Sequence, residues 1–140
     1  MRIVIDTNVL ISAALSPDGA PAQLLQQVLT EHLLVFSSAT FAEFESRLGR
    51  PRFDRYINLD ERKALLHDLS ASAMWVAIAP ELAATRYSRD AADDMFVHAA
   101  LAAGASLLIT GDQDLLLLAK HLNDSYQLTV CKPAYALGLV

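Results

Sequence analysis

The stretch DMFVHAALAAGASLLITGDQD, residues 94–114, places a helix-like segment, a strand-like segment and three aspartates in close succession. At about 100° per residue, nearly every direction around the segment after Asp94 is apolar or alanine, so we expect a largely buried helix. Only Asp94 and His98, one turn apart, form a polar stripe on it. The run SLLIT (106–110) has the continuous aliphatic character of a strand covered on both faces. A buried helix followed by a buried strand predicts an α/β fold.

Strand-like and helix-like segments alternate over the rest of the chain. Four further aliphatic runs have strand character: RIVID (2–6), LLVFS (33–37), WVAIA (75–79) and LTVCK (128–132). Helix-like segments lie at 20–33, 37–49, 59–73 and 115–122. This alternation predicts right-handed crossovers and a three-layer α/β/α sandwich with a central parallel sheet of four to five strands. At 140 residues, we expect a single domain over 1–140.

Local signals mark the expected helix ends. Pro21 suits a first helical turn, and Gly49 suits the end of the helix at 37–49. Asp60 is a candidate N-cap for the helix at 59–73. These signals set the helix boundaries that the sequence predicts.

The composition restricts the class of protein. A net charge of −5 argues against a protein that holds nucleic acid by bulk electrostatics. The segment 47–63, however, carries six basic and three acidic residues, which predicts one basic face on an otherwise acidic molecule. A single cysteine, Cys131, cannot form an internal disulfide, and no segment has the length of a membrane span. We therefore expect a cytoplasmic protein that does not associate with membranes.

Acidic residues follow two of the expected strands. In open parallel sheets, ligands bind beyond the carboxyl ends of the strands. Asp6 ends the first strand, and Thr110 ends the fourth and is followed by Asp112 and Asp114. Each of these aspartates could simply cap the helix that follows it. The alternative is that they are ligands of a metal ion.

A metal ion would explain why so many carboxylates are expected at one edge of the sheet. Asp94 enters the protein with its buried helix, whereas Asp90 and Asp93 are explained by the preference of acids for a first helical turn. We expect His98 to be a local hydrogen-bond partner or a residue at the rim, and the alternative is a ligand or proton carrier. Converging carboxylates repel one another, and an all-oxygen site suits Mg²⁺ or Mn²⁺. Such a site activates water for phosphodiester hydrolysis.

Four stretches, in order and correctly spaced, make the chain resemble the PIN-domain family, specifically toxin components of toxin–antitoxin pairs related to VapC-like ribonucleases. They are RIVIDTNVLISAALSPDGAPAQLL (2–25), FAEFESRLGRPRF (41–53), RDAADDMFVHAALAAGASLLITGDQDLL (89–116) and the final strand with KPAY (132–135). The resemblance implies a metal-dependent endoribonuclease in which activated water attacks in line and leaves 5′-phosphate and 3′-hydroxyl ends. It also implies a homodimer and a cognate antitoxin as partner.

The resemblance assigns roles to individual residues. The family's four acids match Asp6, Glu43, Asp94 and Asp112, which would be both catalytic and metal-binding. Asp93 and Asp114 would be neighbouring ligands that act through water, and Thr7, Asn8 and Thr110 would orient the carboxylates. Without the family, Glu43 has a structural explanation, an exposed i,i+4 ion pair with Arg47. The family commonly has a proline and a polar or basic residue where this chain has Ala91, Ala92 and Met95.

The basic segment supplies candidate RNA contacts. They are four arginines, Arg47, Arg50, Arg52 and Arg55, together with Phe53 or Tyr56 for base stacking. The alternative is an ordinary solvated helix end and loop. A different class of function is a catalytically degenerate PIN-fold binding module. Two phosphotransfer classes are disfavoured, because Asn8 replaces the second Asp of haloacid-dehalogenase-like enzymes and LLVFSS and WVAIAP lack the phosphoacceptor Asp of a receiver domain.

Overall fold

The structure, a computed structural model, describes residues 1–140. The strands are β1 (Arg2–Ile5), β2 (Leu33–Phe36), β3 (Met74–Trp75), β4 (Leu107–Ile109) and β5 (Thr129–Cys131). The helices are α1 (Thr7–Leu15), α2 (Ala20–Glu31), α3 (Ser38–Leu48), α4 (Leu59–Ser72), α5 (Pro80–Ala83), α6 (Asp94–Ala103), α7 (Gln113–Leu116), α8 (Ala119–Tyr126) and α9 (Pro133–Ala136). Two 3₁₀ turns lie at Pro51–Phe53 and Ala91–Asp93.

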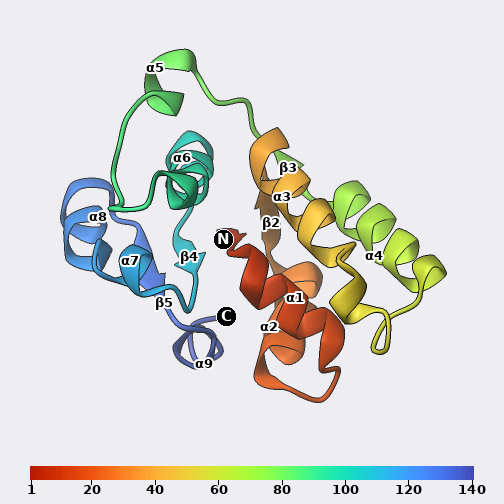
Figure 1. The fold of residues 1–140 in the computed structure, drawn as a ribbon. Helices are drawn as coiled ribbons and strands as arrows, with labels where there is room; N and C mark the ends of the chain where they lie inside the picture. Colours follow the sequence, from red (N-terminus) through yellow and green to blue (C-terminus); the bar gives the residue numbers. More distant parts are fainter.

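The strands form one parallel sheet in the order β3-β2-β1-β4-β5, which confirms the predicted fold class. Helices α1 to α4 cover one face of this sheet, and α6, α7 and α8 cover the other (Figure 1). The strand order reverses at β1, since β2 follows on one side of it and β4 on the other. A reversal of this kind opens a crevice beyond the carboxyl ends of the two strands that flank it. The ends of β1 and β4 are therefore where a ligand is expected.

Two apolar cores lie on opposite faces of the sheet. Ile3, Ile5 and their neighbours pack against α1 to α4, whereas Val4 and Leu108 pack against α6 and α8. Successive strand residues point to opposite faces, so strands buried on both sides need continuous apolar runs. Helix α6 has seven buried residues out of ten, as its apolar circumference predicted. Its burial fixes the position of the acidic residues at its start.

Three predicted boundaries differ from the structure. The predicted strand at 75–79 is reduced to β3 at the edge of the sheet, because beyond Trp75 the contact with β2 ends with one hydrogen bond of 2.9 Å from the Val76 N–H to the Phe36 carbonyl. Helix α4 is capped by Asn58 rather than by Asp60, since Asn58 and Glu61 form a reciprocal capping box. The predicted helix at 115–122 is divided into α7 and α8. No helix has the length and apolar character needed to cross a lipid bilayer.

Candidate metal centre

Asp6 lies at the end of the central strand, directly beside the end of β4. Its backbone N–H donates to the carbonyl of Ile109 at 2.9 Å. Its side chain is buried, and Oδ2 accepts a hydrogen bond of 2.6 Å from the Thr110 hydroxyl. Burial raises the pKa of Asp6, with Asp112 adding to the rise, while the contacts with Thr110 and Asn8 oppose it. Asp6 caps α1, as one of the two sequence interpretations predicted, and it also faces the other acids.

Thr110 connects Asp6 to the acids that follow β4. The hydroxyl that donates to Asp6 also accepts from the backbone N–H of Asp112 at 2.9 Å. Asp112 in turn uses Oδ1 to accept from the N–H groups of Asp114, at 2.7 Å, and Leu115, at 3.4 Å. Asp112 is therefore the N-cap of α7 through one oxygen. Its other oxygen, Oδ2, accepts no hydrogen bond from the protein and is open to a ligand.

Three aspartates converge at this edge of the sheet. Asp93, Asp112 and Asp114 each offer one carboxylate oxygen, and these oxygens all lie within 4.8 Å of one another. Oδ2 of Asp93 is buried and has no hydrogen-bond partner within the protein. Burial raises the pKa of Asp93 to about 6, and the charges of Asp112, Asp90, Asp6 and Asp114 add to the rise. An unpaired buried carboxylate oxygen among like charges fits a divalent cation bound by oxygen ligands.

The hydrogen bonds of Asp94 favour a structural role for it over the expected role as a metal ligand. Its side chain is buried, as predicted, but both of its oxygens already have partners. Oδ1 accepts from the backbone N–H groups of Tyr87 at 3.2 Å and Ser88 at 2.7 Å, and Oδ2 accepts from Arg86 Nε at 3.0 Å. These three donors, all from residues 86–88, tie the loop before α6 to the start of the helix. Asp93, one residue earlier, points into the acidic cluster instead.

The neighbours of Asp94 behave as local structural groups. Nε2 of His98 lies 2.8 Å from the Thr85 carbonyl oxygen, in keeping with its expected role as a hydrogen-bond partner. Asp90 caps the 3₁₀ turn by accepting from the Ala92 N–H at 3.0 Å. The backbone from Thr85 to Ala92 is thus held by side chains of α6 and of the loop itself. This loop positions Asp93.

Glu43 is paired with an arginine that also contacts the residues after β1. Arg47 Nε lies 3.4 Å from Glu43 Oε1, which is the i,i+4 pair that the sequence suggested. The same Arg47 donates from Nη1 to Asn8 Oδ1 at 3.1 Å, and its charge lowers the pKa of Asp6. Helix α3 is thereby tied to the residues that follow β1. The hydroxyl of Thr7, expected to orient a carboxylate, is buried without a partner.

The arginines predicted to contact RNA have different surroundings. Arg47 is committed to Glu43 and Asn8. Arg50, Arg52 and Arg55 are exposed, and the guanidinium groups of Arg52 and Arg55 lie over Phe53 and Tyr56, at 4.8 and 5.5 Å from the ring centroids. Of the two predicted stacking residues, Tyr56 is exposed, whereas Phe53 is partly buried against the core.

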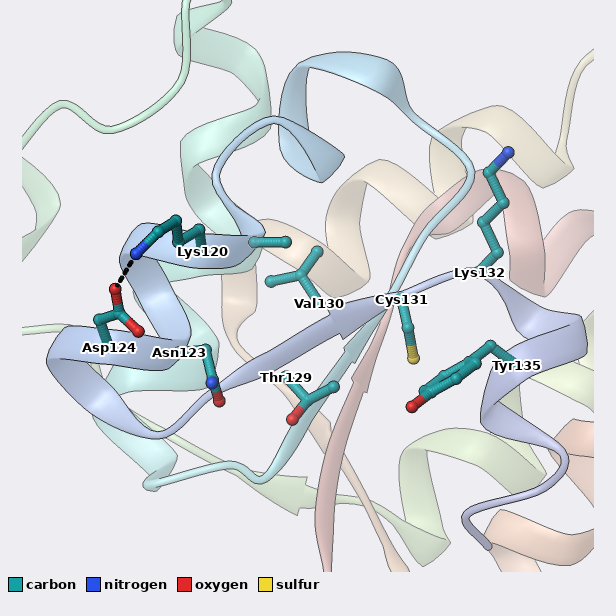
Figure 2. A pocket seen from close by; sticks show the side chains of 9 residues that line it. Lys120, Asn123, Asp124, Thr129, Val130, Cys131, Lys132 and Tyr135 are labelled. Carbon is teal, nitrogen blue, oxygen red and sulfur yellow. Dashed lines mark hydrogen bonds and ion pairs between the residues drawn. The ribbon is translucent and has the colours of Figure 1, made fainter.

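Two surface hollows lie near the ends of β4 and β5. A hollow of about 330 Å³ is lined by Asn8, Gly111 and Asp112, so it adjoins the acidic cluster. A larger groove of about 630 Å³ runs along the edge strand β5, where Figure 2 shows Lys120, Lys132 and Tyr135. Its one acidic side chain, Asp124, is paired with Lys120 at 2.8 Å. The groove along β5 therefore lacks the carboxylates that a divalent cation needs.

Fold and site define a class of protein: a parallel α/β protein with an acidic centre at the point where its strand order reverses. Residues 2–114 match the PIN domain family, and this match runs from β1 to the start of α7 and includes every acid of the centre. The chain belongs to the PIN domain family. It is also 33% identical over 122 residues to the uncharacterized protein MJ1680 of Methanocaldococcus jannaschii, covering 84% of this chain and 75% of that protein.

Solved structures share the fold at low sequence identity. The VapBC-1 structure from nontypeable Haemophilus influenzae matches with a TM-score of 0.59 and 17% identity, covering 96% of this chain and 99% of that one. The structure of VapBC2 from Rickettsia felis, bound to a DNA fragment from their promoter, matches with a TM-score of 0.57 and 13% identity, covering 94% of this chain and 98% of that one. The structure of FitAB bound to the IR36 DNA fragment matches with a TM-score of 0.54 and 17% identity, covering 94% of each chain. These likenesses establish a common fold over nearly the whole chain.

Proposed function

We propose that this protein is a divalent-metal-dependent endoribonuclease and the toxin component of a toxin–antitoxin pair. The observation that carries the proposal is the unpaired, buried Oδ2 of Asp93 among the carboxylates of Asp112 and Asp114. The centre lies at the crevice where ligands bind in open parallel sheets. Membership of the PIN domain family supports nuclease chemistry at such a centre.

The proposed ligands of Mg²⁺ or Mn²⁺ are Asp93, Asp112 and Asp114, with Asp6 beside them. Asp6 is close enough that its charge raises the pKa of Asp93. A bound ion supplies an activated water and stabilises charge on the phosphodiester. Glu43 is assigned to the rim of the centre, where its pairing with Arg47 directs it toward the residues after β1. Asp93 takes the place that Asp94 has in the sequence prediction.

The chain's own residues hold this arrangement in place. The Thr110 hydroxyl fixes Asp6 on one side and the Asp112 backbone on the other, so one side chain sets the spacing of two acids. Asp112 is further held as the cap of α7. Such contacts orient the carboxylates before an ion or substrate arrives, which lowers the cost of binding.

The proposed partners are RNA as substrate, a cognate antitoxin and a second copy of the chain, in the cytoplasm. The structures of similar fold are VapBC and FitAB complexes, which supports an antitoxin partner. Exposed Arg50, Arg52 and Arg55 supply positive charge for an RNA strand on an otherwise acidic protein.

The first test is RNA cleavage by the purified protein in Mn²⁺, Mg²⁺ or EDTA, beside Asp6→Asn and Asp93→Asn. We expect cleavage in either ion, none in EDTA, and a loss of about 100-fold or more in each variant, because each removes one carboxylate of a metal centre. Products should carry 5′-phosphate and 3′-hydroxyl ends, which end-labelling distinguishes from cyclic phosphates.

Two outcomes would count against this function. Cleavage that persists in EDTA would exclude the metal mechanism. A wild-type protein that binds RNA and Mn²⁺ without cleaving would instead identify a non-catalytic PIN-fold binding module. The toxin role is tested separately by induced expression, which should arrest growth for the wild type and not for Asp6→Asn.

The affinity for the metal should decrease as the pH is lowered through the range in which Asp93 takes up a proton. The pKa of Asp93 is raised to about 6, so below pH 6 an ion must displace at least one proton to bind. We expect the apparent affinity for Mn²⁺ to fall about tenfold per pH unit below 6 and to change little between pH 7 and 8. Isothermal titration from pH 5 to 8 measures this. A profile that is flat down to pH 5 would contradict the assignment of Asp93 as a ligand.

A further inference from the structure

Arg89 is a basic side chain at the acidic centre that sequence reasoning did not single out. It lies in the loop before α6, four residues ahead of Asp93. Its Nε and Nη2 atoms both donate to Oδ1 of Asp114, at 3.1 and 2.5 Å. Asp114 is one of the three converging aspartates. A guanidinium group therefore lies against the edge of the proposed metal centre.

The contact leaves most of this guanidinium uncommitted. Both hydrogen bonds end on one oxygen of Asp114, and a guanidinium has five N–H donors. The side chain of Arg89 is 74% exposed, so the remaining donors face solvent. Arg86, from the same loop, is different because it bonds both Asp94 and the Ser88 carbonyl. Arg89 is thus the arginine of this loop that is free to take a second acceptor.

A divalent cation would weaken the hold of Asp114 on Arg89. Exposed ion pairs contribute only about 0.2–1 kcal/mol, so little stability is lost when this one opens. A cation among the three carboxylates neutralises much of the charge that attracts the guanidinium. The phosphodiester backbone of RNA is an anion that Arg binds through two parallel hydrogen bonds. Metal binding therefore favours transfer of Arg89 from Asp114 to a phosphate.

We propose that Arg89 is a phosphate-binding residue, which is held on Asp114 without metal and contacts the RNA backbone beside the scissile bond when the centre is loaded. The proposal rests on the proposed ribonuclease function, and it names a basic residue beside the acidic cluster that would bind the substrate. The contact with the substrate depends on the metal, which distinguishes Arg89 from an ordinary surface arginine.

The test compares RNA affinity with and without a divalent ion, by fluorescence anisotropy of a labelled single-stranded RNA. The proteins are wild type, Arg89→Ala, Arg89→Lys and, as a matched control, Lys120→Ala, which opens the exposed Lys120–Asp124 pair. In Ca²⁺, we expect Arg89→Ala to bind about tenfold more weakly and Arg89→Lys about threefold, because lysine keeps the charge but not the planar fork. In EDTA, wild type and Arg89→Ala should bind equally, and Lys120→Ala should match wild type throughout.

A second measurement distinguishes a role of Arg89 in binding RNA from a role in holding the carboxylates of the metal centre in place. Titration of the protein alone with Mn²⁺ should give Arg89→Ala an affinity equal to or up to about threefold above wild type, since a competing cation is gone. Equal RNA affinities of wild type and Arg89→Ala in Ca²⁺, or a loss of Mn²⁺ affinity in Arg89→Ala, would overturn the proposal. If wild type binds RNA without cleaving it, the ribonuclease function fails while anisotropy still decides the role of Arg89. If wild type binds no RNA, both fail.

Discussion

Asp93→Asn should lower the affinity for Mn²⁺ by about 100-fold and, in EDTA at pH 7, raise the temperature of unfolding by about 3 °C. The first effect follows from the loss of a proposed ligand, because Oδ2 of Asp93 has no hydrogen-bond partner in the protein. The second follows because the charge of Asp93 is partly buried and is also repelled by neighbouring carboxylates, and the substitution removes both costs. The pKa of Asp93 is raised from 3.8 to about 6, so the folded state binds the proton more tightly and loses stability as the pH rises through this range. After allowance for solvent screening, about 1 kcal/mol is recovered at pH 7.

Asp90→Asn is the matched control for this prediction. Asp90 lies three residues earlier and also raises the pKa of Asp93, but it is not one of the three converging acids. We expect the affinity of Asp90→Asn for Mn²⁺ to stay within about threefold of wild type. Calorimetric titration and thermal unfolding in EDTA measure both effects. An Asp93→Asn protein that is less stable than wild type without metal, or that keeps its affinity for Mn²⁺, would show that Asp93 has a structural role.

Asp94→Ala should lower the free energy of unfolding by about 3 kcal/mol, because buried donors lose their acceptor. The N–H groups of Tyr87 and Ser88 would be left without a partner, and Arg86 would lose its carboxylate. Asp94→Asn retains an oxygen for the two backbone donors, so we expect a loss of only about 1 kcal/mol. Urea unfolding in EDTA measures both values, and the absence of metal separates them from any effect on binding.

The affinity for Mn²⁺ should distinguish Asp93 from Asp94 in the opposite sense. Asp94→Asn should bind Mn²⁺ within about threefold of wild type, whereas Asp93→Asn should not. The pattern is informative because the two aspartates are adjacent in the sequence and receive the same substitution. A reversed pattern, with Asp94→Asn stable but unable to bind Mn²⁺, would restore Asp94 as the ligand.

The fold was predictable because its strands and helices are encoded by local patterns. Continuous apolar runs identified strands buried on both faces, and the apolar circumference of α6 identified a helix inside the protein. The short β3 was overestimated because residues 76–79 have a strand-like composition but little of a neighbouring strand to pair with. Asn58 was missed as the cap of α4 because both Asn58 and Asp60 suit that role, and position relative to Glu61 decides between them.

Part of the acidic cluster was predictable from the ends of the strands, whereas Glu43 and Asp94 do not lie among the converging acids. The carboxyl ends of β1 and β4 placed Asp6 and Asp112 at the same edge, and strand alternation with helices was sufficient for this. Which of Asp93 and Asp94 faces the centre depends on the path of the loop from Thr85 to Ala92. That path is set by Arg86 and by backbone donors, for which the sequence has no periodic signal. The same loop carries Arg89, and for this reason its contact with Asp114 also escaped prediction.

The hydrogen bond from Thr110 to Asp6 has a consequence for protein synthesis. It joins residues separated by 104 positions, and the first strand occupies the middle of the sheet. Long-range pairings of this kind form slowly, because closing a long loop of chain costs conformational entropy. While a ribosome is still translating the segment around residue 110, the emerging chain holds Asp6 but not its partners. An acidic centre built in this way is complete only when most of the chain has emerged from the ribosome.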